Sequence, residues 1–399
     1  MKKLLVLLVM LVAMNANAQW VQISNGMGLD KNIIPMIVNG NNIFAGSDSS
    51  NVGGRVYLST NLGTNWIQTS FLNFPAWSLS SIGNNILAGT PGMGLLYSTN
   101  NGINWLQSSL VGRAVWSLTV TGSYVFAGTS QYGVYISSNN GVNWSQVNFN
   151  YNSVPSLTTI GTTIYAGTFG SGVFKSTNNG SNWTQTGLNN LDVRCLTVSG
   201  NNILAGTEFQ GIFLSTNNGS NWTQTSLNDK HIYCITISGN NIFAGTDSFG
   251  VYVSTNFGIS WTQKNQGLTN LRAVSSLLII GNDIFAGTYG SSVWRRPLSE
   301  IIGIQNISTE IPSAFSLSQN YPNPFNPSTT IRFQVTGNSE VVIKVYDVQG
   351  REVQTLVNEK LQPGVYETSF DGSRLTSGVY FYKLIADGFT ETKKMLLIK

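Results

Sequence analysis

The sequence predicts an all-β protein with two parts: a seven-bladed β-propeller whose N-terminal strand closes the last blade, and a C-terminal Ig-like β-sandwich. Two repeated phrases predict the first part. Tryptophan recurs every 39 residues, and an Ala-Gly-Thr or Ala-Gly-Ser phrase occurs seven times. A fixed period in this range is typical of one supersecondary unit stacked on copies of itself. The tryptophans are Trp66, Trp105, Trp144, Trp183, Trp222 and Trp261, and the phrase glycines are Gly46, Gly89, Gly128, Gly167, Gly206, Gly245 and Gly287.

Each repeat is predicted to form four short strands. Residues 195–198 and 203–205 are β-rich runs separated by Ser-Gly-Asn-Asn, which predicts a hairpin. A second hairpin follows, in which Gly-Ile-Phe-Leu-Ser and Asn-Trp-Thr-Gln flank a tight Asn-Asn-Gly-Ser turn. Four strands in about forty residues are typical of propeller blades. Frequent Gly and Asn exclude helical repeats, and a β-solenoid, which needs a shorter repeat, stays a minor alternative.

The seventh repeat lacks its fourth strand, and the N-terminus supplies one. This copy runs from Leu277 to Trp294, which aligns with Tyr252, Phe213 and Phe174 of earlier copies, and Arg-Arg-Pro then replaces the turn. Trp20-Val21-Gln22 matches the fourth-strand sequence Trp183-Thr184-Gln185. We therefore expect the N-terminal strand to complete the last blade and so to remove exposed sheet edges.

The first eighteen residues match a secretory signal peptide. Lys2 and Lys3 precede an apolar run over residues 4–14, and Ala-Asn-Ala at residues 16–18 offers a cleavage site. The run is about half the roughly 20 residues that a spanning helix needs. No later stretch is long and apolar enough to cross a bilayer, so we expect no membrane span in the mature chain.

Charge is sparse and scattered. Residues 19–300 hold ten Lys or Arg and eight Asp or Glu, the last 99 residues hold nine of each, and the formal net charge is +4. Nucleic-acid binding requires a basic cluster, and the chain has none.

Cys195 and Cys234 occupy equivalent positions in neighbouring repeats, where other copies have serine. Equivalent residues point the same way, so we favour two packed thiols over a disulfide.

The tryptophan phrase is Ser-x-Asn-x-Gly-x-x-Trp, and it resembles the Asp-box, or BNR repeat, of sialidase-like propellers. In that family the third position is usually Asp. The resemblance implies a structural turn between the third and fourth strands, away from the ligand face. An Asx side chain can accept hydrogen bonds from its own turn's amides, glycine permits the left-handed geometry, and tryptophan packs between sheets. The third-position residues are Asn61, Asn100, Asn139, Asn178, Asn217 and Asn256.

A ligand site should lie where the copies differ. Loops between the second and third strands, and loops between blades, share the face opposite the tryptophan-phrase turns. Aromatic side chains, one arginine and two carboxylates in these loops could bind a sugar or peptide chain. The alternative is that the tryptophans and one tyrosine only fill space between blades. The candidate ligand-binding residues are Trp77, Trp116, Tyr132, Arg194, Phe209 and Tyr233.

An enzymatic function has less support. A sialidase-like site needs three arginines and a Tyr–Glu pair, but only Arg194, with Arg113 and Arg272 as further candidates, lies in a suitable loop. Other glycosidases need two carboxylates about 5–10 Å apart, for which Glu208 and Asp247, at matching loop positions, are candidates. His231 has no second histidine to form a metal site or a triad, so we expect a solvated loop histidine, no metal and no cofactor.

The end of the chain forms a separate unit. Residues 301–316 are predicted as a linker, and residues 317–399 contain short strands with Gly and Pro turns, typical of a small β-sandwich. Tyr-Pro-Asn-Pro, Tyr-Asp-x-x-Gly-Arg, Gly-Val-Tyr and a final Lys-Lys-rich strand occur in this order. The segment resembles the type A C-terminal sorting domain of the type IX secretion system. The resemblance implies export to the surface of a bacterium with an outer membrane, with the secretion machinery as partner.

Three hypotheses follow for residues 19–300. The first is a secreted or surface-displayed propeller, expected to be monomeric, that binds a glycan or protein through its variable loops. The second is a secreted glycoside hydrolase of sialidase-like fold that uses Glu208 or Asp247. The third is a structural surface protein without a dedicated ligand.

Overall fold

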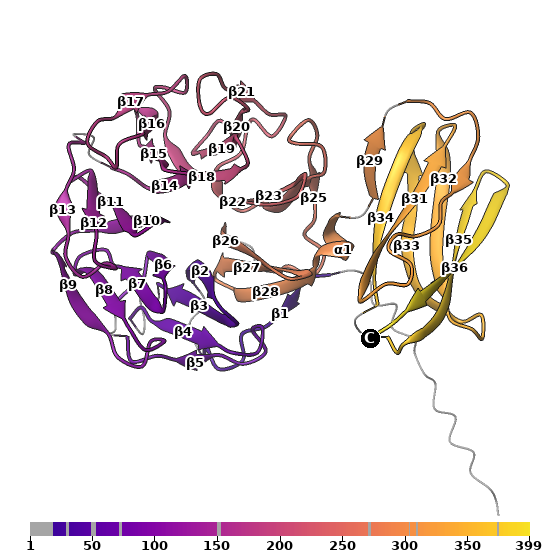
Figure 1. Cartoon of the computed structure of the whole chain (residues 1–399), viewed down its shortest axis with the longest axis horizontal. Helices are drawn as coiled ribbons and strands as arrows, with labels where there is room; N and C mark the ends of the chain where they lie inside the picture. Colours follow the sequence, from indigo (N-terminus) through magenta and orange to yellow (C-terminus); the bar gives the residue numbers. More distant parts are fainter. Residues whose placement is uncertain are drawn as a thin grey trace, which may run out of the picture.

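The computed structural model describes residues 19–399 except 29–31, 49–52, 72–73, 150–152, 270–272, 303, 309 and 373–374. The predicted signal peptide, residues 1–18, lies outside the described residues. The described part of residues 19–297 forms seven four-stranded antiparallel sheets, arranged around a common centre, and the C-terminal domain lies beside them (Figure 1). The fold is all-β with repeated propeller-like sheets, as predicted.

The strands of each sheet follow one another from the centre outward, except in the last sheet (Figure 1). The first strands are β2 (Ile33–Asn39), β6 (Ser78–Ile82), β10 (Val115–Thr121), β14 (Ser156–Ile160), β18 (Val193–Ser199), β22 (Ile232–Ser238) and β26 (Ala273–Ile280). The second strands are β3 (Asn42–Ser47), β7 (Asn85–Gly89), β11 (Tyr124–Thr129), β15 (Thr163–Thr168), β19 (Asn202–Thr207), β23 (Asn241–Thr246) and β27 (Asp283–Tyr289). The third strands are β4 (Val56–Ser59), β8 (Gly94–Ser98), β12 (Val134–Ser137), β16 (Gly172–Ser176), β20 (Ile212–Ser215), β24 (Gly250–Ser254) and β28 (Ser292–Pro297). The outer strands are β5 (Ile67–Gln68), β9 (Leu106–Val111), β13 (Ser145–Gln146), β17 (Thr184–Gln185), β21 (Thr223–Gln224), β25 (Thr262–Gln263) and β1 (Val21–Gln22).

The N-terminal strand completes the last sheet, as the repeat alignment predicts. Strand β1 pairs with β28, with Gln22 opposite Trp294. In the fifth sheet Gln224 lies opposite Phe213 in the same way. The Gln22 side chain repeats the pattern too, because its Nε2 donates to the Ser291 carbonyl at 2.8 Å. The outer-strand glutamines of other sheets donate in the same way to a carbonyl in the loop between the second and third strands of their own sheet. The alignment of Trp294 with Phe213 is thus confirmed.

Neighbouring sheets approach closely at the glycine of the Ala-Gly-Thr phrase. A Cβ atom on Gly167 would lie 2.7 Å from Val193 Cγ1 of the next sheet, and one on Gly245 would lie 2.6 Å from the Val274 carbonyl oxygen. Only glycine leaves room for that contact. The glycine also faces a small residue of its own sheet, since Cys195 pairs with Gly206 and Cys234 with Gly245.

Both cysteines are free thiols, as favoured from the sequence. Cys234 Sγ donates to the Val274 carbonyl at 3.4 Å. Burial raises the pKa of Cys195 to about 12, so the thiol stays protonated and unreactive. The two cysteines therefore serve as small packing residues.

The tryptophan-phrase turn is held by one serine and one asparagine. In the copy that ends at Trp183, Ser176 Oγ donates to Asn178 Oδ1 at 3.0 Å and accepts from the Gly180 amide at 2.9 Å. Asn178 Oδ1 also accepts from the Asn182 amide at 2.9 Å. All six copies make these bonds. Asparagine therefore supplies the acceptor oxygen that the turn needs, without a charge.

The C-terminal domain contains two four-stranded sheets in its described residues, in the orders β29-β34-β31-β30 and β33-β32-β35-β36. Helix α1 connects it to the propeller, and no helix among the described residues is long and apolar enough to cross a membrane. The elements are α1 (Leu298–Ile302), β29 (Ile304–Ser308), β30 (Ser316–Leu317), β31 (Ser328–Val335), β32 (Ser339–Tyr346), β33 (Glu352–Leu361), β34 (Gly364–Asp371), β35 (Gly378–Ala386) and β36 (Phe389–Leu397).

Part of the predicted linker is a strand. Residues 301–316 were expected to be irregular, but β29 pairs with β34, with Ile304 opposite Thr368. Without β29, the backbone groups along this edge of β34 would have no partner strand. The edge is thus covered by a segment far away in sequence, a pairing that local composition does not reveal.

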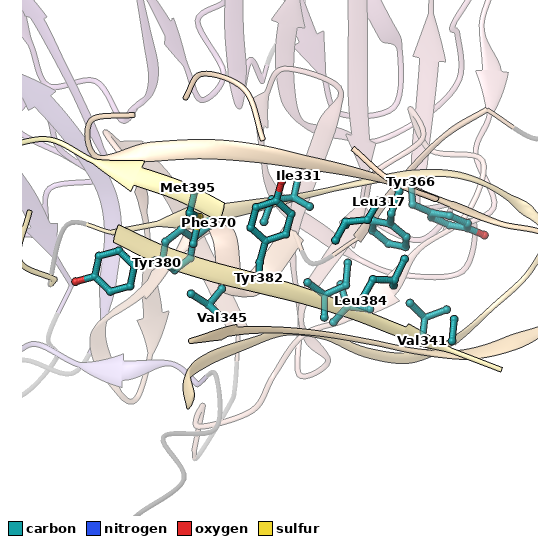
Figure 2. Packing of buried hydrophobic residues seen from close by; sticks show 14 of the residues in the cluster. Leu317, Ile331, Val341, Val345, Tyr366, Phe370, Tyr380, Tyr382, Leu384 and Met395 are labelled. Atoms are coloured by element: carbon teal, nitrogen blue, oxygen red, sulfur yellow. The ribbon is translucent and has the colours of Figure 1, made fainter. Parts of the chain in front are cut away.

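The two C-terminal sheets share one apolar core (Figure 2). Ile331 and Phe370 come from one sheet, Val345, Leu384 and Met395 from the other, and all five are buried. The alternating pattern of β31 and β32 puts every second side chain into this core.

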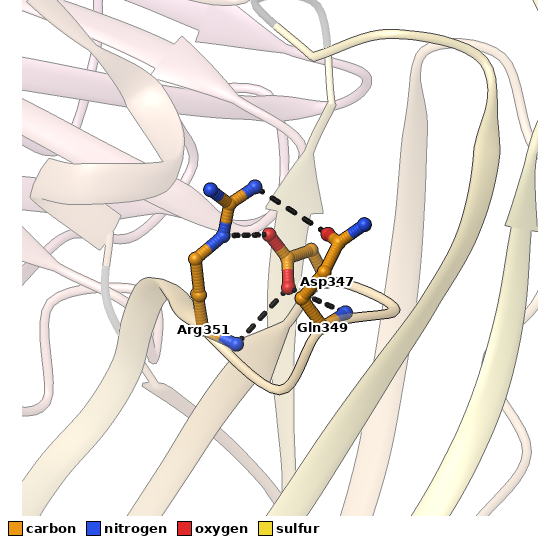
Figure 3. Close-up of polar contacts among 3 residues, drawn as sticks. All are labelled: Asp347, Gln349 and Arg351. Carbon is orange, nitrogen blue, oxygen red and sulfur yellow. Dashed lines mark hydrogen bonds and ion pairs between the residues drawn. The ribbon is translucent and has the colours of Figure 1, made fainter.

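The C-terminal motifs fix turns and strand ends. In Tyr-Asp-x-x-Gly-Arg, Asp347 Oδ1 accepts from the Gln349 and Arg351 amides, and Asp347 Oδ2 accepts from Arg351 Nε at 2.7 Å (Figure 3). Desolvation alone would raise the pKa of Asp347, but these bonds outweigh it and hold the pKa below its usual value. In both Gly-Val-Tyr motifs the tyrosine hydroxyl donates to the carbonyl four residues earlier: Tyr366 to Gln362 and Tyr380 to Thr376.

Replacing Trp20 by alanine should destabilise the propeller by about 3–5 kcal/mol, the usual cost of truncating a buried tryptophan. Trp20 is only 2% exposed, and its indole Nε1 donates to the Lys264 carbonyl at 2.8 Å. Urea unfolding of residues 19–399 measures the change. Val21→Ala, on a side chain that is 55% exposed, is the control and should change stability by less than about 0.5 kcal/mol. Equal effects of the two variants would mean that this strand does not stabilise the last sheet.

Removing the acceptor oxygen of Asn178 should lower the free energy of unfolding, whereas replacing Asn178 by the aspartate that is usual in the Asp-box should leave it nearly unchanged. Asn178→Ala leaves the Ser176 hydroxyl and the Asn182 amide without their acceptor, so we expect a loss of about 1–2 kcal/mol. Asn178→Asp keeps an acceptor oxygen and should stay within about 0.5 kcal/mol of the parent. The same unfolding assay compares them, and a similar loss in both variants would contradict the acceptor role.

Candidate functional site

Two variable positions in each repeat lie side by side at one end of the sheets. The first follows the Ala-Gly-Thr phrase, and the second lies at or just before the start of the first strand, where several sheets have a β-bulge. Register shifts between Val193 and Cys195 and between Ile232 and Cys234 place Arg194 and Tyr233 at bulges. A bulge re-aims the side chain of its extra residue. The residues after the phrase are Asp48, Pro91, Ser130, Phe169, Glu208, Asp247 and Tyr289.

Backbone hydrogen bonds hold these two positions together. The Glu208 amide donates to the Asp192 carbonyl at 3.0 Å, and the Asp247 amide donates to the His231 carbonyl at 3.1 Å. Asp48, Ser130 and Phe169 are tied in the same way to the carbonyls of residues 32, 114 and 153, whereas Pro91 has no amide to donate. The side chains at these positions differ between repeats.

Six side chains from these positions form one continuous series of contacts. Trp77 and Trp116 have ring centroids 6.3 Å apart, and Trp116 meets Phe169 edge-on at 5.4 Å. The Arg194 guanidinium lies 5.3 Å from the ring centres of both Phe169 and Tyr233. These separations are favourable for aromatic and cation–π pairs. We call the set the aromatic–arginine cluster: Trp77, Trp116, Phe169, Arg194, Tyr233 and Tyr289, the last with its ring centroid 6.2 Å from that of Tyr233.

The cluster crosses six consecutive sheets and is flanked by acids. Trp77 Nε1 donates to Asp48 Oδ2 at 3.3 Å, so the first sheet contributes as well. Arg194 forms an ion pair with Glu208 at 3.5 Å. Burial raises the pKa of Tyr289 to about 12, with further effects of Tyr233 and Asp48 in the same direction. The tyrosine hydroxyls are therefore neutral at physiological pH.

His231 is not the solvated loop residue that its polar neighbours in sequence suggest. Its ring stacks on Tyr233 at 4.6 Å with an interplanar angle of 12°, and Phe209 lies 5.9 Å away on a neighbouring loop. Burial lowers the pKa of His231, and the charge of Arg194 lowers it further, against raising effects of Glu208 and Asp247. The histidine is thus a neutral packing partner of the cluster at pH 7.

The predicted ligand residues are only partly brought together. Trp77, Trp116, Arg194 and Tyr233 join the cluster, and Phe209, 72% exposed, reaches it through His231. Tyr132 does not join it: the Arg113 guanidinium lies 3.9 Å from its ring centre and covers one face of the ring. Phe169, Tyr289 and Asp48 were not among the predicted ligand-binding residues. They occupy the same repeat position as Glu208 and Asp247, directly after the repeated phrase, so the repeat alignment could have identified them.

A cavity of about 230 Å³ opens beside Tyr233 and Tyr289. Asn32, Asp247 and Ala273 complete its lining, so sheets from both ends of the repeat series contribute. The Gly290 amide donates to Asn32 Oδ1 at 2.9 Å and fixes that side chain across the junction. The cavity therefore combines two aromatic faces, one carboxylate and one amide.

Two of the charged side chains that a hydrolase would use have partners within the protein. Glu208, one of the two candidate catalytic acids, is ion-paired with Arg194. Arg113 stacks on Tyr132 away from the cluster, and Arg272 lies outside the described residues. Within the described ranges, no group of three or more His, Cys, Asp or Glu side chains could hold a metal ion.

Comparisons with known proteins define both parts of the chain. Residues 319–399 match the family model described as a secretion system C-terminal sorting domain, and residues 113–234 match that of the DUF6242 beta propeller domain. The chain carries a sorting domain. It directs secretion through the type IX system to the cell surface or the extracellular space of a Gram-negative bacterium. With the propeller domain before the sorting domain, this is a secreted or cell-surface propeller protein whose export involves the secretion machinery.

Solved structures resemble the propeller in fold only. YCF48 from Cyanidioschyzon merolae is 13% identical, with a TM-score of 0.58 over 70% of this chain and 99% of that chain. YCF48 bound to D1 peptide is 15% identical, with a TM-score of 0.55 over 71% and 95%. The WD40 beta propeller domain of Doa1 is 16% identical, with a TM-score of 0.55 over 69% and 96%. No curated protein matches the chain in sequence.

Acidification should destabilise the parent protein more than a His231→Gln variant. The pKa of His231 in the folded state lies below its ordinary value of 6.5, so the unfolded state binds the proton first. The stability that this residue contributes is complete above that ordinary value and decreases as the pH falls toward the folded-state pKa. Urea unfolding at about pH 7.5 and about pH 5.5 tests this, because the difference between the two pH values should narrow in the variant. An unchanged difference would contradict the buried, neutral state of His231.

Proposed function

We propose that this protein is a secreted seven-bladed propeller that binds a protein or glycan ligand on the face formed by the aromatic–arginine cluster. One observation carries the proposal: a series of Trp, Phe, Arg and Tyr side chains in mutual contact runs over six consecutive sheets at the positions where the repeats differ. Packing alone needs no such variation, because the phrase glycines recur in all seven repeats and the tryptophan-phrase turns in the first six.

Its composition favours a protein ligand over a glycan. Binding hot spots in protein interfaces are enriched in Trp, Tyr and Arg, and they cluster at the centre of the interface. The cluster holds two Trp, two Tyr and one Arg, and its side chains are half-buried, so each is held in place but keeps a surface to offer. Held side chains lose little entropy on binding. The similar structure of YCF48 with D1 peptide supports a peptide ligand for a propeller of this architecture.

The alternatives explain less. A sialidase-like hydrolase would need further arginines beside Arg194, and the ion pair of Glu208 with that arginine leaves Asp247 as its one candidate acid. A purely structural protein would not need different side chains at equivalent positions of each sheet. Binding accounts for both the variation and the contacts.

The proposal includes the boundaries and family of the parts. Residues 1–18 are a signal peptide, residues 19–300 are a propeller of Asp-box type with asparagine at the acid position, and an Ig-like sorting domain follows. Its first strand is β29, inside the stretch expected to be linker. We propose a monomer, because most outer strands are two residues long and offer short edges for pairing with another chain.

Ligand binding should depend on the cluster and not on Tyr132. The full mature chain, residues 19–399, is screened on a glycan array and on an array of bacterial surface-protein peptides, and affinity for the best probe is then measured. Trp116→Ala and Arg194→Ala should each weaken binding at least about 10-fold, as hot-spot truncations do. Tyr132→Ala, a change of the same kind on the same face but outside the cluster, should change affinity less than about 3-fold. Absence of any ligand on both arrays would favour the structural alternative, and loss of binding only in Tyr132→Ala would place the site elsewhere.

A further inference from the structure

The cavity beside Tyr233 and Tyr289 has a chemical character of its own within the cluster. The two rings meet at 56° with centroids 6.2 Å apart, so they form a corner rather than a stack. Aromatic faces carry negative charge density and attract cations. Asp247 lines the same cavity, which places a carboxylate next to this corner.

Among the described residues, the acids near this corner outnumber the bases. Neither Asp247 nor Asp48 forms an ion pair with another described residue, and the charges of both act on the neighbouring tyrosines. Arg194 sits over Tyr233 and is ion-paired with Glu208. The charge of Arg194 is thus partly neutralised, and the Asp247 carboxylate in the lining is the charged group that an entering side chain would meet.

The size of the cavity limits what can enter. Its volume of about 230 Å³ lies below the roughly 300–1,000 Å³ of pockets that enclose a whole small ligand. It therefore suits one side chain of a longer ligand that lies across the cluster.

We propose that this cavity takes the ammonium or guanidinium group of a lysine or arginine side chain on a protein ligand. The inference rests on the proposed function and names the ligand chemistry at one end of the cluster. The cation would meet the Tyr289 ring and the Asp247 carboxylate beside Tyr233, whose ring already contacts His231 and Arg194, while hydrophobic and aromatic residues of the ligand contact Trp116 and Phe169. The alternative is the ammonium group of an amino sugar in a glycan. The small volume of the cavity and the interface-like composition of the cluster favour a protein ligand.

The test uses end-capped peptide libraries with one fixed central residue: lysine, arginine, norleucine or glutamate. Norleucine keeps the alkyl chain of lysine and removes the ammonium. Binding to residues 19–399 is measured by fluorescence polarisation, alongside chitosan and chitin hexamers. We expect the lysine and arginine libraries to bind at least about 10-fold more tightly than the norleucine library, within the range for a desolvated cation–π contact next to a carboxylate.

Variants assign the preference to the cavity. Asp247→Asn and Tyr289→Leu should each reduce the preference for lysine over norleucine to less than about 3-fold. Glu340→Gln removes one exposed carboxylate of β32 in the sorting domain and serves as the charge-matched control, which should keep the full preference. Melting temperatures verify that each variant is folded, and Tyr289→Phe, which keeps the ring, should retain the preference if the ring face is what matters.

Each other outcome contradicts the inference. Peptide binding that needs Trp116 but shows no preference for basic residues would overturn it and leave the proposed function standing. A preference that survives Asp247→Asn and Tyr289→Leu would place the cation elsewhere. Binding of chitosan but of no peptide library would assign the cavity to an amino sugar, and binding of no probe at all would count against the proposed function as well.

Discussion

The close approach of neighbouring sheets at the glycine of each Ala-Gly-Thr or Ala-Gly-Ser phrase is the constraint on which the rest of the structure depends. In six of the seven repeats, valine or isoleucine of the next sheet occupies the space that a Cβ would need, as Val193 does beside Gly167, and Ala76 lies beside Gly46 in the first. This contact explains why serine or cysteine stands opposite the glycine on the first strand of those six repeats. Because backbone and small residues fix the spacing of the sheets, the bulge position and the position after the phrase are free to vary. The variation between repeats therefore concentrates at these two positions.

Repetition made much of the fold predictable. One period aligns every copy, so the alignment shows both that the last repeat lacks its fourth strand and that the N-terminus has an extra Trp-x-Gln sequence. The pairing of Gln22 with Trp294 follows from these two observations. The turn chemistry was equally readable, because the serine and asparagine act on their own local backbone. The same alignment marked Trp116 and Arg194 as variable residues on one face.

Contacts between elements that are distant in sequence could not be predicted in this way. The stacking of His231 on Tyr233 and its proximity to Phe209 depend on the spacing of two sheets and on the direction a bulge gives to a side chain. The polar sequence around His231 therefore misleads. The packing of Arg113 over the Tyr132 ring could not be predicted for a similar reason. Strand β29 was predicted as linker because its partner β34 begins about sixty residues later, a distance at which local composition carries no information.

The pairing of β1 with β28 has a consequence for the order in which the protein folds. Gln22 and its partner Ser291 are 269 residues apart, whereas the other propeller sheets pair strands that are adjacent in sequence. Contacts between such remote residues form slowly, because a long loop must close before they stabilise anything. The first six sheets can form while the chain is still incomplete, but the last sheet is completed only when almost the whole propeller sequence is present. Until then Trp20 stays exposed to solvent. The open sheets at both ends of the series are therefore the parts of the molecule that chaperones would most need to protect.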